Sequence, residues 1–289
     1  MGRQEVYNSR RNNVVSAITV GFAKGMIFRM DLAVLLGIGG GLLSLILGFM
    51  WEGGHVGSLI QKTAALIVFG GTIGVTVACF SVQDLKVLPQ ILKNALTMKL
   101  PEESEIIDEI VNLADQARRE GLLYLEDQIS TMDNEFLRKG IQLVIDGTES
   151  ELVRNIMETE IISLEERYEV GAGFFEAAGG FAPTMGIIGT VMGLVHVLGN
   201  LEDPTTLGPK IAVAFIATLY GVGSANIFYL PLAGKIKNVS KKEVIIKELI
   251  MEGVIALQGG NNPLLIRERL NAYLNPNNRP PSKKPNEED

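Results

Sequence analysis

Two threonines lie in long stretches of the chain that contain no Asp, Glu, Lys or Arg. Thr190 belongs to residues 177–201 and Thr218 to residues 211–234. Each lies about eight or nine residues from the segment between the two stretches, which at about 1.5 Å per helical residue puts both hydroxyls roughly 12–14 Å from it. Two hydroxyls at one depth could line a polar path or offer oxygen ligands to a hard cation. Each could equally donate to the carbonyl oxygen four residues earlier in its own helix.

An ion path through such stretches would need a charged group from another chain. None of the apolar stretches carries a central carboxylate. Ionisable groups inside a membrane are costly, and they mark ion paths where they occur. His196, toward the end of its stretch, is interpreted as a structural histidine. If this protein moves ions, we therefore expect a second chain to supply the carboxylate.

Other chemistry is not indicated. The sequence has no phosphate-binding loop, nucleophile elbow or zinc helix signature, and its glycine clusters do not link a strand to a helix. We expect no enzymatic activity, no cofactor, no bound metal and no nucleic-acid partner. Cys79 is the only cysteine, so it forms no intrachain disulfide and is expected to act as a small hydrophobic side chain.

The elements that position these groups are predicted to be membrane helices. Residues 32–51, 63–83, 177–201 and 211–234 are stretches of 20, 21, 25 and 24 residues without Asp, Glu, Lys or Arg. About 20 apolar residues suffice for a helix to cross the hydrocarbon core of a bilayer. The sequence therefore predicts an all-α integral membrane protein with four transmembrane helices and a helical cytoplasmic domain between the second and third.

Charge predicts the orientation of these helices. Lysines are more numerous next to the ends that face the long polar regions than next to the short loops, and such an excess marks the cytoplasmic side. The expected segments are a basic N-terminal extension of unknown role (1–29), transmembrane helices 1 and 2 (30–80), a cytoplasmic helical domain (81–170), transmembrane helices 3 and 4 (171–234), and a cytoplasmic helix with a disordered tail (235–289). Both termini are then cytoplasmic.

The predicted cytoplasmic domain is acidic and helical. Residues 81–170 contain 20 Asp or Glu against 9 Lys or Arg. Apolar residues recur at helical spacing after Pro101, which suits a first helical turn. Gly121, Gly140 and Gly147 are expected to break the helices.

Small residues form one face on each of the last two predicted membrane helices. Because lipid supplies no hydrophobic force that pairs helices, small side chains let helix backbones approach closely. The faces could serve packing within the chain, a wall for a further helix, or both. They consist of Gly186, Gly189, Thr190 and Gly193 on one helix and Ala214, Thr218, Gly221 and Ala225 on the other.

Two prolines lie near the cytoplasmic ends of these helices. Pro183 belongs to the third predicted helix and Pro231 to the fourth. Proline removes a backbone donor and kinks a helix. The kinks could pass motion between membrane and cytoplasmic domain, or simply bend the helices.

Three segments resemble the flagellar stator family of MotA and PomA, within the MotA/ExbB/TolQ group. Residues 181–195 (FAPTMGIIGTVMGLV) are similar to the third helix of that group, and residues 217–233 (ATLYGVGSANIFYLPLA) to the fourth helix of MotA and PomA. Residues 118–126 (RREGLLYLE) resemble the segment of MotA that faces the rotor. ExbB and TolQ have three membrane spans in a different arrangement, which favours the MotA branch.

The resemblance implies a torque-generating ion channel in the bacterial inner membrane. Five copies would surround two helices of a MotB-type single-span partner, whose aspartate takes the ion, and the cytoplasmic domain would push the rotor protein FliG. The matching positions carry three roles: Thr190 and Thr218 near the ion path, with the small residues as the partner-helix face; Pro183 and Pro231 in conformational coupling; and Arg118, Arg119 and Glu126 in rotor contact.

Alternatives remain open at this point. The chain could be an ExbB/TolQ-like energiser of a cell-envelope process, or a self-contained transporter, although the internal repeats and intramembrane charges of that class are not evident. The coupling ion is open too. Thr190 is typical of sodium-driven relatives, but Ala217 precedes Thr218 where those relatives tend to have two threonines.

Overall fold

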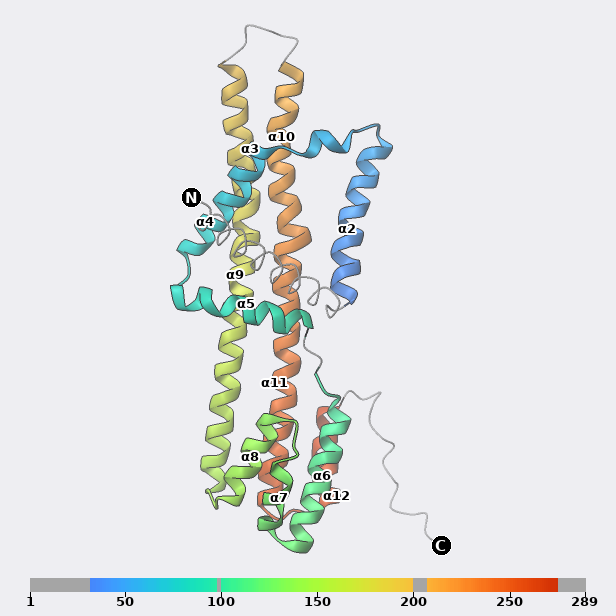
Figure 1. The fold of residues 1–289 in the computed structure, drawn as a ribbon, viewed down its shortest axis with the longest axis vertical. Coiled ribbons are helices and arrows are strands. Elements are labelled where there is room, and N and C mark those ends of the chain that lie inside the picture. Colours follow the sequence, from blue (N-terminus) through green and yellow to red (C-terminus); the bar gives the residue numbers. More distant parts are fainter. Residues whose placement is uncertain (1–31, 98–99, 200–206, 275–289) are drawn as a thin grey trace, which may run out of the picture. The chain divides into compact units, whose positions relative to one another are not determined.

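The computed structural model describes residues 32–97, 100–199 and 207–274, and all regular structure in these ranges is helical (Figure 1). The predicted all-α class is therefore confirmed for the described residues. The chain forms two compact units, residues 1–98 with 167–238 and residues 99–166 with 239–289. Helices α9 (Ser150–Leu198) and α11 (Leu230–Gln258) contribute to both units. The predicted extension 1–29 and the tail from Asn275 lie outside the described residues.

The first unit begins with helix α2 (Leu32–Trp51), none of whose residues is buried. A helix that is apolar on all sides and uncovered by its own chain suits a lipid environment. A 3-10 turn, η1 (Val56–Leu59), then leads to three consecutive pieces, α3 (Lys62–Ala65), the π-turn η2 (Leu66–Gly70) and α4 (Gly71–Ala78).

The second predicted span ends close to the expected boundary at residue 80. Charge-free composition continues to residue 83, but the helix stops at Ala78 and the chain bends by 118° into α5 (Val82–Thr97). Ser81 and Asp84 explain the new start, because the Ser81 N–H donates to the Asp84 carboxylate at 3.0 Å and the Asp84 N–H donates to the Ser81 hydroxyl at 3.2 Å. This reciprocal capping box is a local signal in the sequence.

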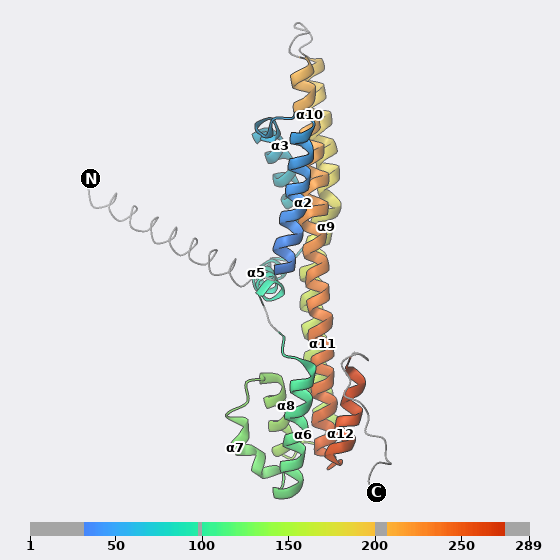
Figure 2. The same cartoon turned by 90° about the vertical axis from the view of Figure 1, so that its right-hand side faces the viewer.

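The remaining helices of the first unit are α9 from residue 167 onward, α10 (Leu207–Ser224), the π-turn η5 (Ala225–Tyr229) and the start of α11. Figure 2 shows α9 and α10 as adjacent antiparallel helices. Among the described residues, three helical segments are long and apolar enough to cross a membrane, or four if the bent pair around Ala78 counts as one span.

The two prolines have different local surroundings. Helix α9 continues as a single helix through Pro183. Pro231 is the second residue of α11 and directly follows the π-turn η5, in which the N–H of Leu230 donates to the carbonyl of Ala225. A proline ring crowds the carbonyl four residues before it, and a wider turn relieves that crowding. The distortion expected at Pro231 thus takes the form of a π-turn.

The second unit consists of shorter helices around one apolar core. They are α6 (Glu103–Glu120), η3 (Leu122–Tyr124), α7 (Leu125–Ile129), α8 (Glu135–Ile145), α12 (Pro263–Leu270) and η6 (Asn271–Tyr273), together with the parts of α9 and α11 that belong to this unit. Its core includes Ile107, Ile110, Leu137, Ile141 and Leu249. The helix predicted from apolar spacing after Pro101 is confirmed as α6, which buries Ile106, Ile107, Ile110 and Ala114.

Two of the three expected glycine breaks are confirmed and one is wrong. Gly121 ends α6 with φ +91°, and Gly147 separates α8 from α9 with φ +74°, values that glycine adopts most readily. Gly140 lies inside α8. A Cβ there would come within 2.8 Å of the Met157 side chain and 3.0 Å of that of Val254, so this glycine allows close helix packing.

Candidate functional site

The hydroxyls of Thr190 on α9 and Thr218 on α10 lie 2.6 Å apart. The Thr190 oxygen is also 3.0 Å from the carbonyl oxygen of Ala214 and 3.1 Å from that of Gly186. Thr190 is 9% exposed. The equal depth predicted from residue counting is thus matched by direct contact. The bond from Thr190 to the carbonyl four residues earlier in its own helix is present at the same time.

The proton count of this pair defines what it can do. Each hydroxyl has one proton and two lone pairs. If Thr218 donates to Thr190, and Thr190 donates to a carbonyl of Gly186 or Ala214, both protons are used within the protein. The lone pairs of the half-buried Thr218 oxygen then remain for a ligand. The pair can accept a hydrogen bond or coordinate a cation, but it cannot carry a charge.

Small residues hold α9 and α10 close enough for this contact. A Cβ at Gly186 would lie 2.8 Å from the Ala217 carbonyl oxygen, and one at Gly193 would lie 2.8 Å from the Ala214 Cβ. Gly189 is similarly close to Ala217. The predicted small faces therefore pack against each other within the chain. Their further assignment as a wall for a partner helix stays a prediction.

A cavity of about 340 Å³ adjoins the same face. Thr63, His196 and Lys210 supply polar groups to its lining, while Gly189 and Ala214 belong to its apolar part. Sequence reasoning assigned no role to Thr63. Its proximity depends on how α3 packs against the other helices, which no local pattern encodes.

Tyr220 is a second residue that sequence reasoning missed. Its hydroxyl donates to the carbonyl of Leu59 and accepts the N–H of Gln61 at 3.1 Å. Its ring stacks on Phe69 with centroids 5.7 Å apart. Tyr220 lies two residues after Thr218, so α10, which carries one hydroxyl of the pair, is tied to the segment before α3.

The first unit contains an ion pair between α9 and α11. Lys237 and Glu176 form an ion pair at 2.6 Å, with both side chains about half exposed. Among the described residues, no group of three or more His, Cys, Asp or Glu side chains could hold a metal ion.

The three predicted rotor-contact residues lie on the surface of the second unit. Arg118 and Arg119 belong to the last turn of α6, and Glu126 belongs to the first turn of α7. Arg119 pairs with Asp115 at 2.8 Å. Arg118 and Glu126 are exposed and form no ion pair with any described residue. They are therefore available to a partner of complementary charge.

Comparisons with known proteins agree over most of the chain. Residues 128–248 match the MotA/TolQ/ExbB proton channel family, and residues 35–121 match the N-terminal region of motility protein A. The chain is 40% identical over 246 residues to chemotaxis protein PomA of Vibrio alginolyticus, a match that covers 85% of this chain and 96% of PomA. It is 35% identical over 250 residues to motility protein A of Bacillus subtilis, covering 85% and 91%.

Solved structures give the same result. The flagellar MotAB stator complex from Bacillus subtilis matches with a TM-score of 0.81 and 34% identity, covering 86% of this chain and 98% of that one. The structure of C. jejuni MotAB matches with a TM-score of 0.82 and 28% identity, covering 89% and 100%.

Proposed function

Because the chain belongs to the motility protein A and PomA branch of the MotA/TolQ/ExbB proton channel family, we propose that it is a stator subunit of a bacterial flagellar motor. It resides in the inner membrane, forms an ion channel with a MotB-type partner and converts ion flow into torque on the rotor. The paired hydroxyls of Thr190 and Thr218 carry this proposal, because they form a polar point between two apolar helices.

The missing charge defines the partner. The hydroxyl pair can coordinate or relay an ion but cannot neutralise one, and no carboxylate lies at its level in residues 177–201 or 211–234. A single-span subunit with one membrane aspartate supplies that charge. Five copies of this chain surround two such helices, with the seam between the packed small faces of α9 and α10 directed toward them. The coupling ion is a proton or sodium.

Four membrane crossings place both termini and the acidic domain in the cytoplasm. The segment α3–η2–α4 supplies the second crossing, α5 begins the cytoplasmic part, and the lysine excess sets the direction. Changes at Pro183 and at the π-turn before Pro231 transmit the occupied state of the channel toward the cytoplasmic domain.

Rotor contact is electrostatic. Arg118, Arg119 and Glu126 face FliG, where they form ion pairs with side chains of the opposite charge. Exposed ion pairs contribute only about 0–1 kcal/mol each. Contacts of that size can form and release at every step, which a rotating machine requires.

The test replaces Thr218 in the strain that carries this gene. Thr218→Val keeps the shape of the side chain and removes the hydroxyl, whereas the control Thr218→Ser keeps the hydroxyl. We expect Thr218→Val cells to assemble normal filaments without swimming, and Thr218→Ser cells to swim.

A second variant, Pro183→Ala, is expected to give the same paralysis. Normal swimming by both Thr218→Val and Pro183→Ala would contradict the proposal and favour an ExbB/TolQ-like energiser. Swimming speed measured with and without sodium, and with a protonophore, identifies the coupling ion.

A further inference from the structure

A cavity of about 550 Å³ opens in the second unit, where α8 packs beside α9 and α11. Three cationic side chains line it, those of Arg138, Lys139 and Lys247. Its volume lies within the range of about 300–1,000 Å³ that is usual for small-molecule sites. We propose that this cavity binds a small organic anion that bears a phosphate group.

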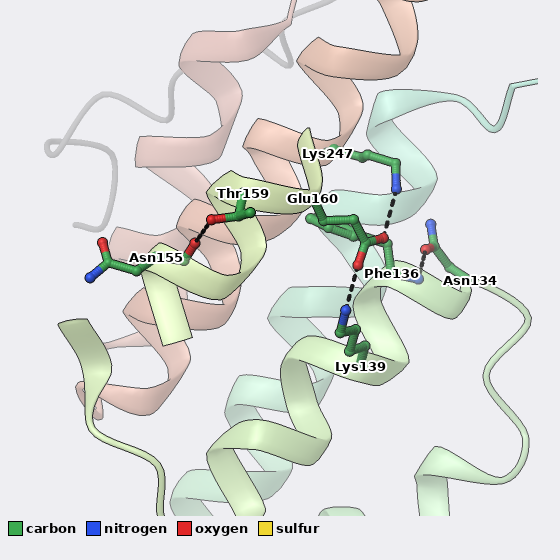
Figure 3. A network of polar contacts seen from close by, with 7 residues as sticks. All are labelled: Asn134, Phe136, Lys139, Asn155, Thr159, Glu160 and Lys247. Atoms are coloured by element: carbon green, nitrogen blue, oxygen red, sulfur yellow. Dashed lines mark hydrogen bonds and ion pairs between the residues drawn. The ribbon is translucent and has the colours of Figure 1, made fainter. Parts of the chain in front are cut away.

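The charges in the cavity do not balance. Figure 3 shows Glu160 between two lysines, with Lys139 Nζ at 2.6 Å from one carboxylate oxygen and Lys247 Nζ at 3.3 Å from the other. One negative charge is therefore shared by two positive ones. Arg138 and Glu135 form a looser pair at 3.7 Å. The three cations and two carboxylates of the lining leave one uncompensated positive charge. By contrast, acidic residues outnumber basic ones 20 to 9 between residues 81 and 170.

Lys247 is held in place before any ligand arrives. Its side chain is 14% exposed, and Nζ lies 4.0 Å from the centroid of the Phe136 ring. A cation over an aromatic face is attracted to it. Because the ammonium is already ordered, an anion that binds it does not have to fix a mobile side chain.

The helix that carries Lys139 is fixed as well. The Asn134 side chain caps α8 by accepting the N–H groups of Phe136 and Leu137 at 3.1 Å each. On the facing helix the Thr159 hydroxyl donates to the carbonyl of Asn155 at 2.7 Å (Figure 3). Both walls of the cavity are thus regular helix whose polar groups bond locally.

The lining favours a phosphorylated organic molecule over a plain carboxylate. Glu160 already provides the two lysines with a carboxylate, whereas a phosphate brings up to two charges and three strong acceptor oxygens. The remaining lining includes the apolar side chains of Ile129 and Leu143 and the amide of Gln142. These groups can cover an organic body that inorganic phosphate lacks.

The cavity lies next to α7, the short helix that carries the predicted rotor-contact residue Glu126. Ile129 is the last residue of α7, whose first turn carries Glu126. A bound molecule would contact this short helix and restrict its movement. This consequence rests on the proposed function, whereas binding itself does not.

Calorimetric titration of the purified full-length chain, co-expressed with its partner, tests the site with AMP, adenosine and inorganic pyrophosphate as probes. We expect saturable binding of AMP and pyrophosphate and none of adenosine. Lys139→Met and Lys247→Met should each weaken AMP binding about tenfold or more, since each removes a charge-assisted hydrogen bond. Lys139 is half exposed, so its replacement leaves the fold intact.

The matched control is Arg267→Met, which removes a cation of the same unit that pairs with Asp108 at 2.6 Å outside the cavity. It should bind AMP like the unaltered chain. Absence of saturable AMP binding would overturn the site, whether or not pyrophosphate binds, as would unchanged AMP affinity in Lys139→Met. Because the readout is binding and not swimming, its failure is distinct from failure of the stator assignment.

Discussion

Replacing Gly221 by alanine should separate α9 from α10. A Cβ at this position would lie 3.0 Å from the Gly186 Cα and 3.1 Å from the Gly186 nitrogen, and closer still to the carbonyl oxygen of Ala182. All three are backbone atoms, which cannot rotate out of the way. Since carbon contacts are comfortable from about 3.5 Å, the helices must move apart by at least about 0.5 Å.

The cost follows from this displacement. Overpacking of a close-packed interface costs about 1–3 kcal/mol, partly offset by the greater helix propensity of alanine, worth up to about 1 kcal/mol. The same movement would stretch the contact between Thr190 and Thr218 from 2.6 Å toward about 3.1 Å, beyond the usual length of a hydroxyl–hydroxyl bond. We therefore expect lower stability together with reduced swimming.

Gly223→Ala is the matched control, because it lies two residues away on α10 and a Cβ there meets nothing within 4 Å. Both variants would be purified in the stator complex and melted at one heating rate, because membrane complexes often unfold irreversibly. Gly221→Ala should melt several degrees below Gly223→Ala, at roughly 2–4 °C per kcal/mol. Equal melting temperatures would refute the close backbone contact.

Three further outcomes follow from other contacts. Burial, and then repulsion from Asp133, raise the pKa of Glu109 above its ordinary value of 4.5. The protonated carboxyl therefore contributes its full stability below pH 4.5, and this contribution is lost as the pH rises through the raised pKa. Glu109→Gln should stabilise the complex at neutral pH by less than about 1 kcal/mol after solvent screening, and should give no gain in acid. Tyr220→Phe should cost about 1–2 kcal/mol and speed hydrogen exchange at the Gln61 amide. Asn134→Ala should lose about 1 kcal/mol of cap stabilisation in thermal melts, whereas Asn134→Ser should retain most of it.

Each of these has a result that contradicts it. A stabilisation by Glu109→Gln that is as large in acid as at neutral pH would mean that charge is not the cause. Unchanged exchange at Gln61 would show that the Tyr220 hydroxyl does not restrain the segment before α3. Equal melting temperatures of the alanine and serine variants of Asn134 would show that the side-chain cap does not stabilise α8.

Composition predicted the apolar helices because bilayer thickness imposes a minimum length on them. Helix α2 coincides with the charge-free stretch 32–51, whereas the stretch 211–234 covers most of α10, the π-turn η5 and the first residues of α11. The charge-free stretch 63–83 runs past the end of α4 at Ala78, because absence of charge does not reveal a bend, but the predicted boundary at residue 80 lies within two residues of that end. The capping box of Ser81 and Asp84 at the start of α5 is the local signal of the new helix.

The candidate site was predictable only in part. Counting along two helices placed Thr190 and Thr218 at one depth, since rise per residue is nearly constant. Tyr220 and the cavity around Lys247 were not found, because each joins elements distant in the chain. Gly140 was misjudged because glycine serves two purposes, positive φ and close approach, and composition does not separate them.

The π-turn before Pro231 also changes the phase of the helix that follows it. Ala225 and Ala233 are eight residues apart and both are 1% exposed, although eight residues of regular helix would rotate the second by roughly 80° past the first. A π-turn absorbs one residue, so the interval behaves like seven and both alanines return to one side. Deleting a single residue from Ala225–Tyr229 would leave a regular α-helix in which the later side chains of α11 keep their direction, whereas a deletion in the regular part of α11 would turn the side chains after it by about 100°. The π-turn thus sets the direction of the later side chains of α11, in addition to relieving the crowding by the Pro231 ring.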